Sequence, residues 1–373
     1  MSLRTLRKRV LILLCLCSLL ISGCEFRDID LRLFIVAMGV DVVEDRPEML
    51  RYTFKIAVPT GDPKSGELKS IIIQQESSSV ARAVREIKSK VDKELDFAHC
   101  RVLLLGEAYA RKGIRDVEEW IIRRRDTQLI MYPAVAVPDA KTILNISPAT
   151  ERIAGNAKAL ALSEEGTESP YIAKTYLFDV DRRVRESGID PYMPVITVDN
   201  KEEGVLNINK TALMDKERVK LMLEPEESKL LNVLMIRNLL TDLGTTMNGS
   251  RYEMNVDRSR ARFKIVVPEP GKEEIQYKLT IGGNLEEKED YDQLTHSELR
   301  ELEQAFNESL SQEVTKLLEK IRETGTDPLG FGLRYFATHW NNNTEKQQWE
   351  AMYPHITFKV EVDTQIKGTG YSR

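Results

Sequence analysis

The sequence is poor in the residue types that carry out most enzyme chemistry. It contains four cysteines and four histidines among 373 residues. Four cysteines are too few for a disulfide scaffold, and His99, His296, His339 and His355 lack cysteines at the spacing of a zinc site. The GxxxxGK[ST] phosphate loop, a GxGxxG turn after a strand, HExxH and GxSxG are all missing. We therefore expect no catalytic residue, no metal site and no cofactor.

An excess of positive charge is also missing. Lysine and arginine number 54 against 59 aspartates and glutamates, which gives a net charge of −5. From this balance we expect no concentrated basic face, which argues against a nucleic-acid partner. The 42% hydrophobic and 30% charged residues are typical of a globular chain, so disorder and a polytopic membrane protein are excluded. The length predicts two or three domains.

The N-terminal apolar run is too short to cross a membrane comfortably. Val10–Ile21 is 12 residues long, which spans about 18 Å as a helix against a hydrocarbon core of about 30 Å. Positively charged residues precede it and small residues follow it, as in a secretory signal peptide. The positive residues are Arg4, Arg7, Lys8 and Arg9. We predict a signal peptide over residues 1–23 and export of the remaining chain.

Cys24 is the predicted lipidation site. The sequence Ile21-Ser22-Gly23-Cys24 resembles the bacterial lipobox, in which diacylglycerol alkylates the thiol and cleavage leaves the cysteine as the first residue. Buried methylene groups contribute about 0.8 kcal/mol each, so two acyl chains anchor a protein stably. This predicts attachment at the outer face of the cytoplasmic membrane. An ordinary signal peptide or a buried structural cysteine are the alternatives.

Residues 24–200 are predicted to form an N-terminal α+β region. The apolar run 34–38, closed by Gly39, indicates a buried strand, and residues 52–58 alternate as a half-buried strand does. The serines 77–79 offer an N-cap for a helix that follows at residues 80–91. Helices and strands alternate without a nucleotide-binding loop, which indicates mixed or antiparallel sheets with packed helices.

Residues 201–373 are predicted to form a C-terminal α+β domain. Alternating strands are expected at residues 219–223, 263–267, 275–281 and 356–362. Gly271 suits the turn of a hairpin between the second and third of these strands. Thr295 and Glu298 form a capping box, and apolar residues then follow at helical spacing as far as Ile321. The predicted domain is an antiparallel sheet with one long amphipathic helix.

Three local clusters could suggest chemistry. Neighbours in an extended strand point to opposite faces, so His99 and Cys100 are interpreted as structural residues. The run 123–125 of three arginines is interpreted as a solvated helix end, with anionic lipid headgroups or an acidic partner as the alternative. A third cluster comprises Trp340, Trp349 and Tyr353, which we interpret as packing rather than as a ligand cage.

Several stretches, in order behind the lipobox, carry a family resemblance. They are residues 27–30 (RDID), 37–41 (AMGVD), 97–101 (FAHCR), 105–107 (LGE), 125–126 (RD) and 327–332 (DPLGFG). The chain resembles the Ger(x)C family, the lipoprotein C subunits of spore nutrient germinant receptors. Members usually have tryptophan directly after the lipidated cysteine, where this chain has Glu25-Phe26.

The resemblance implies a non-enzymatic receptor subunit, lipid-anchored at the inner spore membrane and needed for nutrient-triggered germination. Its partners would be a multi-spanning B subunit and an A subunit with cytosolic domains. It also implies three α+β domains, which would divide residues 24–200 into two subdomains. The alternatives are a solute-binding lipoprotein of a nutrient importer, whose repeated βα units are not evident here, and a cell-wall or peptide hydrolase. Neither residues nor resemblance identify a nutrient.

Overall fold

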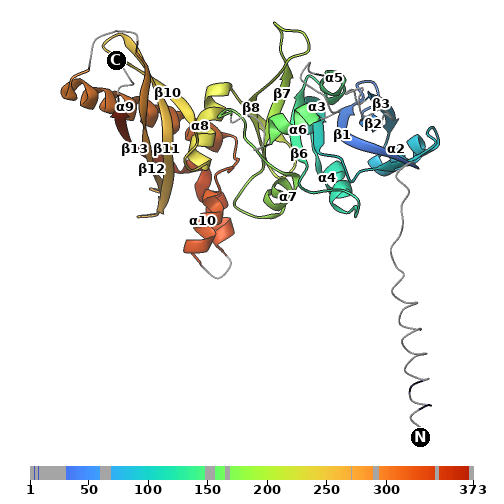
Figure 1. Cartoon of the computed structure of the whole chain (residues 1–373). Coiled ribbons are helices and arrows are strands. Elements are labelled where there is room, and N and C mark those ends of the chain that lie inside the picture. Colours follow the sequence, from blue (N-terminus) through green and yellow to red (C-terminus); the bar gives the residue numbers. More distant parts are fainter. Residues whose placement is uncertain are drawn as a thin grey trace.

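The structure is a computed structural model that describes residues 4, 7, 31–58, 69–147, 156–163, 169–269, 271–288, 294–340 and 344–368. Two sheets lie side by side in an elongated molecule, and helices pack on both of them (Figure 1). The first sheet has nine strands and the second has four. The α+β class with mixed sheets is confirmed.

The first sheet is parallel at its centre and antiparallel at its margins. Parallel strands are β1 (Arg32–Val42), β4 (Glu94–Asp96), β5 (Val102–Gly106), β6 (Tyr132–Val137) and β7 (Tyr192–Val198). The antiparallel strands are β2 (Leu50–Val58) and β3 (Lys69–Ser77) beside β1, and β8 (Leu206–Met214) and β9 (Val219–Leu223) beside β7. The expected boundary near residue 200 falls on the turn between β7 and β8, inside one continuous sheet.

Helices cover both faces of this sheet. One face carries α2 (Val80–Lys88), α3 (Glu107–Lys112), α4 (Arg115–Ile122) and α7 (Leu177–Arg185). The other face carries α5 (Ala140–Asn145) and α6 (Asn156–Leu162). Because strands buried on both faces need no polar side, residues 102–105 of β5 are continuously apolar. The predicted N-cap of α2 is confirmed, since the Ser79 side chain accepts the Arg82 N–H.

The second sheet follows chain order. It contains β10 (Thr241–Met247), β11 (Ser250–Val266), β12 (Glu274–Lys288) and β13 (Thr357–Gly368). The predicted hairpin is confirmed, because β11 and β12 are antiparallel and Gly271 between them has a φ of +84°. One correction concerns β13, which runs parallel to β12. Alternation shows which side chains are buried but not the strand direction, and here a long helical crossover makes the parallel return possible.

That crossover begins with the predicted long helix. The capping box of Thr295 and Glu298 is present at the start of α9 (His296–Glu323), whose apolar stripe from Leu302 to Ile321 packs on the second sheet. Two shorter helices follow, α10 (Phe331–Thr338) and α11 (Glu345–Met352), and then the 3₁₀ turn η2 (Tyr353–His355). None of the helices in the part of the chain described here is both long and apolar enough to span a membrane.

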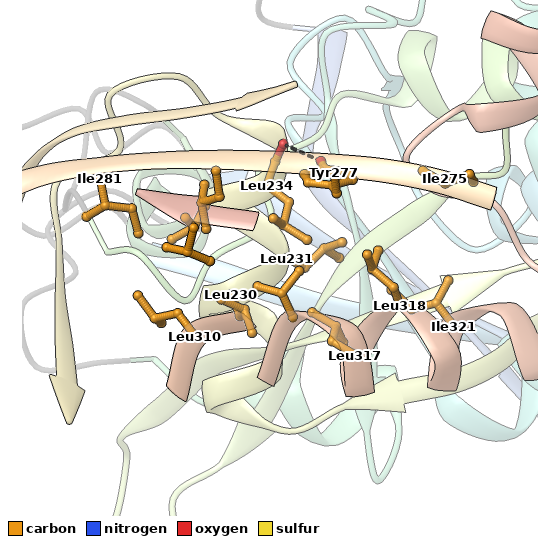
Figure 2. Packing of buried hydrophobic residues seen from close by; sticks show 14 of the residues in the cluster. Leu230, Leu231, Leu234, Ile275, Tyr277, Ile281, Leu310, Leu317, Leu318 and Ile321 are labelled. Atoms are coloured by element: carbon orange, nitrogen blue, oxygen red, sulfur yellow. Dashed lines mark hydrogen bonds between the residues drawn. The ribbon is translucent and has the colours of Figure 1, made fainter. Parts of the chain in front are cut away.

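Helix α8 (Pro225–Met235), which our sequence analysis does not predict, lies between the two sheets (Figure 1). Its leucines pack with Tyr277 of β12 and with the leucines of α9, and the Tyr277 hydroxyl donates to the Leu234 carbonyl at 3.3 Å (Figure 2). Leu213 of β8 and Leu223 of β9 belong to the same core. The helix is buried on almost every side, so it lacks the single apolar stripe that identifies a surface helix.

Candidate functional site

The predicted lipidation site, Cys24, lies outside the described residues, as does the RDID stretch at residues 27–30. The Cys24 modification therefore stays a prediction. The other stretches that carry the resemblance fall on described residues, and their geometry shows what their side chains do.

His99 and Cys100 do not form a nucleophile pair. Cys100 is buried, and its thiol lies 3.6 Å from the Val102 carbonyl. Burial raises the pKa of the thiol to about 12, so it stays protonated at neutral pH. His99 is exposed and packs edge-on against Phe34, with 5.1 Å between ring centroids. Both residues thus pack against their surroundings, although they lie at a turn between β4 and β5 and not in the extended strand that our interpretation assumed. Over the described ranges, no three His, Cys, Asp or Glu side chains are grouped for a metal ion.

The arginine run 123–125 is largely neutralised within the chain. Arg123 pairs with Glu119 at 2.7 Å. Arg124 lies 4.5 Å from the ring centroid of Phe97 and 4.7 Å from that of Trp120, and it also pairs with Asp126. The Arg-Asp stretch of the resemblance thus uses Arg124 as the partner of Asp126. Two of the three arginines are therefore paired with carboxylates of the chain itself, whereas Arg125 is exposed.

The tryptophans and tyrosine near the C-terminus do not surround a common ligand space. Trp349 and Tyr353 are buried and stack on each other, with ring centroids 5.0 Å apart. Trp349 also contacts Tyr335, with centroids 5.5 Å apart. Trp340 is 74% exposed. Packing is therefore confirmed as the role of two of the three residues, and Trp340 lies apart from them.

The AMGVD and LGE stretches meet at the start of α5. The buried Asp41 carboxylate accepts the N–H of Ala140 at 2.7 Å and of Lys141 at 3.0 Å. Burial raises the pKa of Asp41, and these two hydrogen bonds oppose that rise. A Cβ on Gly39 would lie 2.9 Å from Ala140 Cβ, and one on Gly106 would lie 2.0 Å from Asp41 Oδ1. We predicted that Gly39 ends the strand, and this is wrong. Gly39 leaves space for α5, and β1 continues to Val42.

The DPLGFG stretch repeats this arrangement in the second half. The buried Asp327 carboxylate accepts N–H groups from Gly330 at 2.8 Å, Phe331 at 3.0 Å and Gly332 at 2.7 Å, at the start of α10. Burial raises the pKa of Asp327 to about 7 although those bonds lower it, and the neighbouring Asp190 carboxylate adds to the rise. These contacts occupy both oxygens of the carboxylate, so its role is to hold backbone.

Asp327 also joins the two halves of the molecule. Its N–H donates to Asp190 Oδ2, and the Asp190 N–H donates to the Asp327 carbonyl, both at 2.8 Å. Lys216 Nζ pairs with Asp190 Oδ1 at 3.0 Å and donates to the Arg183 carbonyl at 2.7 Å. The Arg183 guanidinium in turn donates to the Pro328 carbonyl at 2.9 Å. Hydrogen bonds thus tie the segment after α7 to the segment before α10, and the salt bridge to Lys216 holds Asp190 in place.

Two glycines complete this junction with a direct backbone contact. A Cβ on Gly188 would lie 2.5 Å from the Gly332 carbonyl carbon, and one on Gly332 would lie 2.7 Å from Gly188 Cα. The Leu333 N–H donates to the Gly188 carbonyl at 2.7 Å. Neither glycine can carry a side chain here without moving the two segments apart. Our sequence analysis singles out neither Gly188 nor Lys216, because the residues that contact Gly188 lie more than a hundred positions along the chain and no local motif links Lys216 to Asp190.

A cavity of about 840 Å³ lies between α8, β10 and α9. Lys229 is its buried cation, paired with Glu226 at 2.8 Å and Asp242 at 3.0 Å. Burial lowers the pKa of Lys229, but the hydrogen bonds and charges of the two carboxylates outweigh burial and raise it overall. The cation is thus already neutralised by side chains of the chain itself.

Comparisons with known proteins give a consistent result. The family model described as "Spore germination protein N-terminal domain" matches residues 25–198, and "Spore germination B3/ GerAC like, C-terminal" matches residues 209–370. Spore germination protein GerQC of Bacillus cereus is 22% identical, over 96% of this chain and 98% of its own. Spore germination protein KC of Bacillus subtilis (strain 168) is 23% identical, over 98% and 96%. A crystal structure of the GerBC protein, 18% identical, matches with a TM-score of 0.57 over 88% of this chain and 96% of its own.

Proposed function

Because the chain belongs to the Ger(x)C family of spore germination proteins, we propose that it is the lipid-anchored C subunit of a germinant receptor. In this role it is needed for nutrient-triggered spore germination. The observation that carries the proposal is the order of the parts along the chain. A lipobox ends at Cys24, the first family domain begins at residue 25, and the second extends to residue 370.

The subunit acts by binding rather than by catalysis. The aspartates and glycines of the family stretches hold helices and join segments. Both oxygens of the Asp327 carboxylate accept backbone N–H groups. Its partners are the membrane-embedded A and B subunits, beside which a diacylglycerol on Cys24 holds it at the outer face of the cytoplasmic, inner spore membrane. A nutrient signal then corresponds to a difference in affinity between two states of this assembly.

The importer alternative has less support from the geometry. A solute-binding lipoprotein has two lobes around a cleft, whereas the described residues of the two halves here share one core through α8. Calorimetry on the purified protein separates the two functions. Tight binding of an amino acid, sugar or nucleoside by the protein alone would favour the importer.

A lipobox variant tests the anchored-subunit proposal. In Cys24→Ala, we expect the folded protein to leave the membrane fraction and the spores to lose most of their nutrient response, because no thiol remains to accept the lipid. Ser22→Ala keeps a small residue before the cleavage site and is the matched control. Membrane fractionation, mass spectrometry of the mature N-terminus and nutrient-triggered germination are the measurements. Normal germination from a protein without lipid would contradict the anchoring role.

A further inference from the structure

The face of the second sheet opposite α9 carries a groove of about 370 Å³. It is lined by Arg237, Asn238, Arg258, Arg260, Arg262, Lys278 and Thr280, which we name the arginine groove. Ala261 and Phe263 of β11 pack against the core, so the alternating Arg260 and Arg262 project from the opposite face. All four arginines are exposed.

A buried serine fixes the shape of the arginine groove. The Ser259 hydroxyl accepts the Leu239 N–H at 3.0 Å, and the Ser259 carbonyl accepts the Asn238 N–H at 2.8 Å. These bonds fasten the turn after α8 to β11 and set Arg237 beside Arg260 and Arg262. The same three arginines also line an adjoining hollow of about 190 Å³. The cluster is therefore built by the fold and does not depend on one flexible side chain.

The positive charge of the arginine groove is uncompensated within the described residues. Arginines elsewhere, such as Arg51 and Arg182, have carboxylate partners, but none of the groove's four arginines pairs with a described carboxylate. Only Lys278 has such a partner, Glu361 at 2.8 Å. Repulsion from Arg262 lowers the pKa of Arg260. The clustered guanidinium groups repel one another, and an anion from outside the chain would relieve this repulsion.

We propose that the arginine groove binds a phosphate-bearing anion. A guanidinium donates two parallel hydrogen bonds to phosphate oxygens, and several guanidinium groups around one hollow match the charge of a phosphate better than that of one carboxylate. The Asn238 amide and the Thr280 hydroxyl add neutral donors at the same place. Either a free phosphate compound or a phospholipid headgroup would supply this chemistry. The proposal is independent of the receptor role and of the lipid on Cys24.

Calorimetry on the full chain in neutral detergent tests the proposal. The probes are pyrophosphate, for free phosphate, and dihexanoyl phosphatidylglycerol below its micelle concentration, for a headgroup. Arg260→Gln/Arg262→Gln is compared with Arg85→Gln/Arg300→Gln, which removes the same charge at two exposed arginines elsewhere. Because the two substitutions remove the guanidinium groups that donate charge-assisted hydrogen bonds, the groove variant should weaken binding about tenfold or more while the control binds normally.

The outcomes separate cleanly. Tighter groove-dependent binding of pyrophosphate supports a free phosphate compound, and tighter binding of the short-chain lipid supports a headgroup. No binding of either probe, or equal weakening in both double variants, would overturn the proposal. A polyglutamate peptide that binds the groove more tightly than both probes would overturn it as well, in favour of an acidic protein segment.

Discussion

Asp41 and Asp327 have the same role in the two halves of the molecule. Each is a buried carboxylate that accepts N–H groups from the first residues of a helix, and each lies beside backbone that only glycine can provide. Buried charge is costly unless hydrogen bonds satisfy it, and the start of a helix supplies unpaired N–H donors. The sequence analysis recognises both stretches as family features. It does not predict the role of Asp41, because α5 lies about a hundred residues away, whereas Asp327 contacts N–H groups only three to five residues along the chain and its role could have been read locally.

Gly106→Ala tests the first of these arrangements. The added Cβ would lie 2.0 Å from Asp41 Oδ1, so the carboxylate must leave the start of α5. Loss of a cap together with an unsatisfied buried group costs about 3 kcal/mol of unfolding free energy. Urea denaturation measures this loss. Gly282→Ala, whose Cβ would meet nothing closer than 3.6 Å, is the control and should change stability by less than about 1 kcal/mol.

A double variant decides whether Asp41 is the cause. In an Asp41→Ala background, Gly106→Ala should cost much less than in the parent protein, because the clashing carboxylate is gone. An unchanged cost would show that another contact is responsible.

The secondary structure elements that could be predicted are those with local signals. The hairpin at Gly271 and the capped helix α9 carry their signals within a few residues, and both are confirmed. The direction of β13 and the existence of α8 depend on contacts between distant segments. Pro225 and the capping box of Glu224 and Glu227 are the local signals that could have identified α8.

Leu231→Ala tests α8 as the element that joins the two sheets. Leu231 is fully buried in the core that residues of both sheets share. Removal of a buried leucine side chain leaves a cavity and costs about 3 kcal/mol. Leu240→Ala, at a leucine that is 50% exposed, should cost less than about 1 kcal/mol. Denaturation followed by Trp120 and by Trp349 should show both halves losing stability together. A loss confined to the second half would contradict the joining role.

At the scale of the whole molecule, the junction of Asp190, Lys216 and Asp327 connects one half to the other. The pKa of Asp327 is raised to about 7 from an ordinary value of 3.8. The folded protein therefore binds a proton at this residue more tightly than the unfolded chain does. Its contribution to stability is present at low pH and is lost as pH rises between about 4 and 7. The two halves should thus be joined most firmly in mildly acidic conditions.

Asp327→Asn removes this titration while retaining the shape of the side chain. Between pH 5 and pH 7, the parent protein should lose stability relative to the variant, with a slope of up to about 1.4 kcal/mol per pH unit. Urea denaturation at a series of pH values measures the difference between the two proteins. A difference that does not change with pH would assign the junction's pH dependence to another group.

The contact between Gly188 and Gly332 has a mechanical consequence. Main chain touches main chain there, so no rotamer change is available to absorb a displacement. A displacement of α10 would move the segment at Gly188 with it, so the two halves of the molecule would rotate together as one rigid unit. If a neighbouring subunit binds one end of the molecule and displaces it, the far end would therefore move as well, without any rearrangement in between.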